Sequence, residues 1–172
     1  MLTNEQVRLT RATFSTGSIG SYMKHNDEVY ASAKLDGDGI MVKIEQGNAW
    51  IVNRGSTSYH ESCPYLVSAV IEAVNVQGLD SALLVGEIHA GDGKLGDLYK
   101  IRTVIANDGE DLRISFFDLL ELNGEDLRSE GFEKRYDILK RITMDNRFVR
   151  VLEQVKCKSA EEHDSEIVED FP

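Results

Sequence analysis

Short apolar stretches separated by turn residues recur along the chain, and they predict β-strands. Val29 to Ala33 is small and apolar, and the pair Gly47-Asn48 between two apolar runs indicates a hairpin. Apolar runs of this length bounded by Gly, Asn and Asp are typical of buried or half-buried strands. We expect strands over residues 28–34, 40–44, 49–52, 83–88, 101–106 and 112–120, the last two joined by the turn Asn107-Asp108-Gly109, and an ambiguous strand over 148–155.

Helical spacing appears in two other segments. With Ser62 as cap and Pro64 in the first turn, apolar residues fall at 66, 67, 70, 71 and 74, and Gly78 ends the pattern. A second helix is predicted after Ser129, with apolar positions 132, 136, 139 and 142. A short helix is expected over residues 4–13, and another helix over residues 159–170. The pattern as a whole predicts an α+β fold, with mixed, mostly antiparallel sheets and packed helices.

Composition agrees with a globular domain. The chain has 172 residues, of which 41% are hydrophobic and 28% charged, enough for one domain with a hydrophobic core. It contains no run of 18 apolar residues and no basic-then-apolar N-terminal signal, so we expect no membrane span and a cytoplasmic location, or a nuclear one in a eukaryote. Cys63 and Cys157 lie far apart, which suggests neither a zinc site nor a disulfide framework.

The net charge is strongly acidic. Thirty acidic against 19 basic residues give −11, and six of the acids crowd into residues 161–170. Because DNA binders need cations that replace phosphate counterions, we expect this chain alone to bind duplex DNA poorly.

Candidate chemistry begins at Lys34, which lies between two predicted strands and is followed by Asp36-Gly37. A lone Lys-x-Asp-Gly is usually an ordinary solvated lysine, so its meaning depends on the rest of the chain. Three further motifs come in order: Asn53-Arg54-Gly55, Val85-Gly86-Glu87-Ile88, and the block Phe-Phe-Asp-Leu-Leu-Glu-Leu-Asn-Gly over residues 116–124. Together, over residues 29–145, they resemble the adenylation domain of ATP-dependent DNA ligases, in the nucleotidyltransferase superfamily that also holds RNA ligases and mRNA capping enzymes.

The resemblance implies a fold, a reaction and partners. Residues 1–172 would be the N-terminal part of an adenylation domain, an incomplete ATP-grasp-like nucleotidyltransferase fold without an oligonucleotide-fold domain. The implied cofactors are ATP and Mg²⁺. The implied partner is nicked DNA, sealed during replication, repair or recombination, with a further nucleic-acid-binding domain beyond residue 172.

By the same resemblance Lys34 is the catalytic nucleophile that takes AMP from ATP. A free lysine is almost entirely ammonium at neutral pH, so burial or metal charge must favour the neutral amine. The apolar run from Tyr30 to Ala33 suggests partial burial. Leu35, Asp36 and Gly37 complete this ATP-binding segment, with Gly37 allowing a tight turn and Asp36 ordering it through the backbone.

Three residues from the later motifs complete the implied ATP site. Glu87 would reach the ribose or a Mg²⁺ ion near the phosphates. Phe117 would stack on the adenine, while strand alternation sends its neighbour Phe116 to the core. Arg54 would hold the 5′-phosphate or the ribose through its forked guanidinium.

The chain also departs from the ligase pattern. Gly39 stands where an arginine is usual, Ser32 where an acid is common, and Val85 where an aspartate precedes Gly-Glu. The later Glu-Gly and Lys-x-Lys motifs do not occur before Pro172, since Lys156-Cys157-Lys158 comes too early to be the latter. We therefore expect the isolated chain to be weakly active or inactive in self-adenylation. An ATP-dependent RNA ligase, and a truncated nucleotide-binding relative without catalysis, remain alternatives.

Overall fold

The computed structural model describes residues 29–74, 78–91, 97–107 and 109–157. These fall into two compact units. One holds residues 35–151, and the other holds 29–34 together with 152–157. The helices predicted over residues 4–13 and 159–170 lie outside the described residues.

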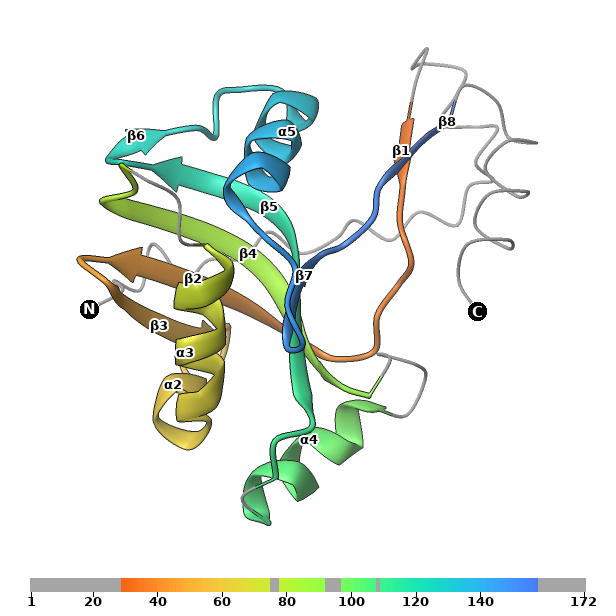
Figure 1. Cartoon of the computed structure of the whole chain (residues 1–172). Coiled ribbons are helices and arrows are strands. Elements are labelled where there is room, and N and C mark those ends of the chain that lie inside the picture. The colour runs from red at the N-terminus through yellow and green to blue at the C-terminus, as the bar shows by residue number, and fades with distance from the viewer. Residues whose placement is uncertain (1–28, 75–77, 92–96, 108, 158–172) are drawn as a thin grey trace. The chain divides into compact units, whose positions relative to one another are not determined.

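The larger unit is built on a six-stranded sheet (Figure 1). The strand order is β3-β2-β4-β5-β6, and β7 pairs with β5 off this path. Every pairing is antiparallel except the parallel pair β5–β7, so the predicted mixed, mostly antiparallel character is confirmed. The strands are β2 (Asp38–Glu45), β3 (Asn48–Asn53), β4 (Ser81–Ala90), β5 (Leu112–Leu122), β6 (Glu125–Asp126) and β7 (Val149–Val151).

Helices cover one face of this sheet. The core combines alternate strand residues such as Ile40, Leu84 and Phe116 with Leu66 of α3 and Leu139 of α5. Alternation places Met41, Leu83 and Val85 on the other face, and they are buried as well. The helices are α2 (Tyr59–Ser62), α3 (Pro64–Ala73), α4 (Asp97–Ala106) and α5 (Phe132–Ile142).

The smaller unit contains one antiparallel pair. Its strands are β1 (Val29–Ala31) and β8 (Val155–Cys157), and Val29 lies opposite Cys157. The predicted strand over 28–34 is therefore shorter, because residues 32–37 have no regular structure before β2. The predicted strand over 148–155 is likewise wrong as one element, since irregular residues 152–154 separate β7 from β8.

One predicted strand, over residues 101–106, is wrong, because these residues belong to helix α4. Ile101 is buried and Val104 and Ile105 are half-buried, a spacing of three and four residues that suits one helix face. Arg102 and Thr103 between them are exposed. The segment from residue 107 therefore joins a helix to β5, rather than two strands.

Helix and hairpin ends differ by small shifts. The cap of α3 is Cys63 rather than Ser62, and the cap of α5 is Gly131 rather than Ser129. The β2–β3 turn is Gln46-Gly47, one residue before the predicted pair, with φ of 50° and 74°. Both residues are in the left-handed region, as a two-residue hairpin turn of type I′ requires.

Candidate functional site

The predicted site residues are divided between the two units. Lys34 is the last residue of the smaller unit's first segment, and its side chain is exposed rather than partly buried. Leu35, Asp36, Gly37, Arg54, Glu87 and Phe117 all belong to the larger unit. The geometry of the candidate site is therefore that of these six residues and their neighbours.

Gly37 and Glu87 are in direct contact. The Gly37 backbone N–H donates a hydrogen bond of 2.6 Å to Glu87 Oε1. A Cβ at position 37 would collide with the Ile88 carbonyl oxygen and lie 2.9 Å from Glu87 Cγ. The glycine is needed because two backbones approach closely, not because of a left-handed turn: among the described residues, Gly37 is not one of the glycines with positive φ. The first and third motifs thus meet at a hydrogen bond.

A β-bulge in β5 displays Phe117. Phe116 is paired with Gly86 and Asp118 with Val85, so Phe117 is the extra residue between two paired positions. Phe116 is fully buried against Gly86, where a Cβ would lie 3.0 Å from its ring, whereas Phe117 is partly exposed. The prediction that Phe116 faces the core is confirmed, and the bulge leaves Phe117 off the core face.

Arg54 lies in an exposed turn after β3 that its neighbour anchors. Asn53 Oδ1 accepts a 2.7 Å hydrogen bond from the Thr57 N–H. The Asn53 amide also donates to Asp38 Oδ2 at 2.6 Å, and the Tyr59 hydroxyl donates to the same oxygen at 2.7 Å. Burial, and next the hydrogen bond to Asp38, raise the pKa of Tyr59, so its phenol remains a donor. Asp38 therefore ties the turn that holds Arg54 to the start of β2.

An ion pair between the fourth motif and helix α5 was not predicted from the sequence. Arg135 of α5 binds Asp118 side-on, with Nε–Oδ1 at 2.8 Å and Nη2–Oδ2 at 2.9 Å. Its Nη1 donates to the Glu130 carbonyl at 2.6 Å. Asp118 directly follows Phe117, so this fork–fork contact fixes the bulge against α5. The two residues are 17 positions apart in the sequence, and helical spacing alone could not pair them.

Another unpredicted group is His89 with Ser115 and Arg150. His89 Nε2 is 2.9 Å from Ser115 Oγ, and Arg150 Nε donates to the same oxygen at 3.0 Å. Burial lowers the pKa of His89, and the positive charge of Arg150 lowers it further. The imidazole is therefore held neutral beside the arginine.

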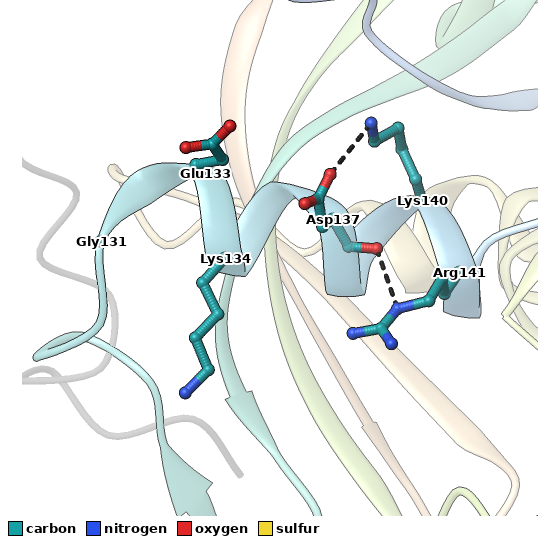
Figure 2. Close-up of a pocket in the computed structure, with 6 residues that line it drawn as sticks. All are labelled: Gly131, Glu133, Lys134, Asp137, Lys140 and Arg141. Carbon is teal, nitrogen blue, oxygen red and sulfur yellow. Dashed lines mark hydrogen bonds and ion pairs between the residues drawn. The ribbon is translucent and has the colours of Figure 1, made fainter.

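A surface depression lies elsewhere, along the exposed side of α5 (Figure 2). It is lined by Gly131, Glu133, Lys134, Asp137, Lys140 and Arg141. Opposite charges there already pair with one another, as Lys140 does with Asp137 at 3.1 Å. None of the predicted site residues lines it.

The described residues contain neither an all-protein metal cluster nor a membrane-spanning helix. Within residues 29–157, apart from the short gaps in the described ranges, no three His, Cys, Asp or Glu side chains gather as a metal site, so Glu87 is not part of an all-protein cage. Magnesium commonly uses only one or two carboxylates together with substrate phosphates, and a single Glu87 fits that mode. Among the same residues, no helix has the length and hydrophobicity needed to cross a bilayer.

Comparison with known proteins gives a consistent result. The family of the ATP dependent DNA ligase domain matches residues 12–170. A DNA ligase of Pyrobaculum islandicum is 28% identical over 93% of this chain, and one of Sulfophobococcus zilligii is 25% identical over 81%. The matches cover 30% and 24% of those two proteins, so this chain spans less than a third of either.

Solved structures share the fold at low identity. The ligase domain of LigD from M. tuberculosis superposes with a TM-score of 0.52 and 20% identity, covering 80% of this chain and 44% of that domain. The ATP-dependent DNA ligase of bacteriophage T7, in complex with ATP, superposes with a TM-score of 0.53 and 13% sequence identity. The match covers 89% of this chain and 56% of that one.

Proposed function

The chain belongs to the ATP-dependent DNA ligase domain family, and from this premise we propose that it binds ATP and accepts AMP on Lys34 as part of a DNA ligase. The family match over residues 12–170 carries the proposal. It is supported by the 2.6 Å hydrogen bond that joins Gly37, the last residue of the lysine motif, to Glu87 of the third motif.

The proposed reaction starts with attack of the neutral Lys34 amine on the α-phosphorus of ATP. A phosphorus–nitrogen bond forms, the bond to the bridging oxygen breaks, and pyrophosphate leaves. AMP then passes to the 5′-phosphate at a nick, and the 3′-hydroxyl displaces AMP to close the strand. The later steps need residues outside this chain's four motifs, and they belong to the whole ligase.

Each site residue has a proposed task. Glu87, held by the Gly37 N–H, orients toward the ribose or toward a magnesium ion, which would neutralise phosphate charge. Phe117, displayed by the bulge, stacks on the adenine, a contact worth on the order of 1–3 kcal/mol. Arg54 contacts a phosphate or the ribose from its anchored turn, and residues 35–37 shape the loop beside them.

Labelled ATP tests the proposal directly. The chain is incubated with ATP radiolabelled at the α-phosphate and with Mg²⁺, and protein-bound label is measured after denaturation. We expect slow labelling that Lys34→Ala abolishes, while replacement of Lys43, a lysine of β2 that pairs with Glu45, by Ala leaves it unchanged. Labelling that survives Lys34→Ala would refute the assignment of the nucleophile.

The substrate is tested with the protein that the complete reading frame encodes. We propose that it seals a nick in duplex DNA faster than the same nick in duplex RNA. Faster sealing of RNA would favour the RNA ligase alternative. ATP binding without labelling or sealing by that protein would favour a non-catalytic relative.

A further inference from the structure

Four residues on neighbouring strands form a row across one face of the main sheet. Gly39 of β2 is opposite Glu87 of β4, Glu87 is opposite Ser115 of β5, and Ser115 is opposite Arg150 of β7. Directly opposed residues project to the same face. Glu87 therefore lies between Gly39, which has no side chain, and Ser115. Arg150 follows Ser115 on the next strand.

Arg150 is an exposed side chain held at one nitrogen. Its Nε donates to Ser115 Oγ, which is fully buried, so the guanidinium is drawn back over β5 toward Glu87. Neighbouring strands lie about 4.8 Å apart, which places the Cα atoms of Glu87 and Arg150 roughly 10 Å from each other. Arg150 is exposed, and within the part of the chain that the structure describes its two terminal nitrogens make no hydrogen bond, which leaves their four N–H donors available to a ligand.

Arg150 is held by buried polar side chains, which is unusual for an arginine whose only role is to be solvated. Ser115 is 0% exposed and His89 only 1%. Burying two polar side chains costs free energy that burying two apolar side chains would not cost. His89 Nδ1 has no hydrogen-bond partner among the described residues, which adds to the cost. The result of this arrangement is a guanidinium fixed in direction on the face of the sheet that carries Glu87.

The neutral state of His89 suits this arrangement. Ser115 Oγ accepts from Arg150 and can donate its own proton to Nε2 of a neutral imidazole. A protonated ring would instead offer a second donor to the same oxygen and repel the arginine. Burial and Arg150 both lower the pKa of His89 and so keep the ring neutral.

We propose that Arg150 binds a phosphate group of the ligase substrates beside Glu87, with Ser115 and His89 as its positioning residues. A forked guanidinium with two free terminal nitrogens matches two oxygens of one phosphate. The phosphate belongs either to ATP or to the 5′ end at a nick, and both present the same chemistry. The inference rests on the proposed function, because it takes Glu87 to lie at the nucleotide site.

Binding measurements on the chain separate the two sources. Dissociation constants are determined for ATP, for adenosine, and for nicked duplexes that carry either a 5′-phosphate or a 5′-hydroxyl. For Arg150→Ala we expect about a tenfold loss of ATP affinity, or the same loss for the 5′-phosphate nick, with adenosine and the 5′-hydroxyl nick unchanged. Arg150→Lys should recover only part of the loss, because it restores the charge but not the fork.

Two variants serve as comparisons. Arg147→Ala removes the same charge from the same segment, where Arg147 lies over the Phe148 ring, and should leave all four constants unchanged. Ser115→Ala should reduce the difference between ATP and adenosine without weakening adenosine binding. That difference reports phosphate contact, which a general loss of packing would not alter selectively.

The outcomes are distinct. If the unaltered chain binds ATP and Arg150→Ala changes neither the ATP nor the nick constants, the inference is overturned while the proposed function stands. If Arg150→Ala loses affinity for ATP and for adenosine by the same factor, the inference is also overturned. If neither nicked duplex binds measurably, the ATP and adenosine constants alone decide whether the inference stands. If the unaltered chain binds neither ATP nor a nick, the proposed function fails and this inference with it.

Discussion

At Gly37 two backbones approach so closely that no side chain fits. A Cβ there would meet the Ile88 carbonyl oxygen and Glu87 Cγ. We expect Gly37→Ala to lower the free energy of unfolding by about 1–3 kcal/mol, because overpacking must push β4 and the loop apart. Urea denaturation measures this change in the free energy of unfolding. Gly55→Ala, whose nearest neighbour would be Asn53 Oδ1 at 3.4 Å, should change stability by less than about 0.5 kcal/mol, and equal effects would contradict the packing argument.

His89 should make stability depend on pH. Burial lowers the pKa of His89 below its ordinary 6.5, so around and below that pH the unfolded chain binds a proton that the folded chain does not. The free energy of unfolding should therefore fall as the pH drops from about 7 toward about 5.5. In His89→Gln, which keeps a polar atom near Ser115 but cannot titrate, the fall should be smaller. Identical pH slopes in thermal denaturation of the two proteins would show that His89 is not responsible.

Single residues were predictable where a motif or the strand period identified them. The core position of Phe116 followed from alternation alone. The network of His89, Ser115 and Arg150 did not, because its members come from three strands and only the register of the sheet brings them together. The role of Gly37 was assigned to a turn, and the close approach of β4 that explains it is a tertiary contact invisible in the sequence.

Strand β5 and helix α5 are joined by the ion pair of Asp118 and Arg135, whose side chains are only 19% and 15% exposed. Replacing Arg135 by Met keeps most of the volume but leaves Asp118 without its fork. We expect a loss of about 1–2 kcal/mol in the free energy of unfolding, discounted from a fully buried pair because water still reaches both groups.

A double-mutant cycle with Asp118→Asn isolates the coupling between these two side chains. Arg128→Met is the matched control. Arg128 pairs with Asp126 at the same 2.8 Å, but the two side chains are 48% and 59% exposed. Because solvent screens that pair, its loss should leave the free energy of unfolding unchanged within experimental error. A coupling near zero for Asp118 and Arg135 would show that they do not hold the two elements together.

At the level of elements, period and turn chemistry predicted most of the large unit. One misassigned element was α4, whose last six residues, 101–106, include three with β-branched apolar side chains. Such a short run fits a strand as well as a helix, and only the contact of Ile101 with the core settles the period. Asn123-Gly124, by contrast, forms the β5–β6 turn with φ of 50° and 82°, a conformation that this pair favours.

The whole chain carries a net charge of −11, and duplex binding should reflect it. At about 0.15 M salt we expect its affinity for intact duplex DNA to be no tighter than the roughly 10⁻⁴–10⁻⁶ M typical of non-specific binding. Fluorescence anisotropy of a labelled duplex measures this. A submicromolar dissociation constant that rises steeply with salt concentration would mean that basic side chains gather on one face of the protein.

The strands β1 and β8 come from opposite ends of the described chain, yet they pair residue for residue from Val29 with Cys157 to Ala31 with Val155. Joining them closes a loop of more than a hundred residues, an entropic cost on the order of 4 kcal/mol for a flexible chain. Three residue pairs cannot offset that cost unaided. We therefore expect the larger sheet to assemble first and shorten the loop, so that the β1–β8 pair forms late in folding and opens early in unfolding.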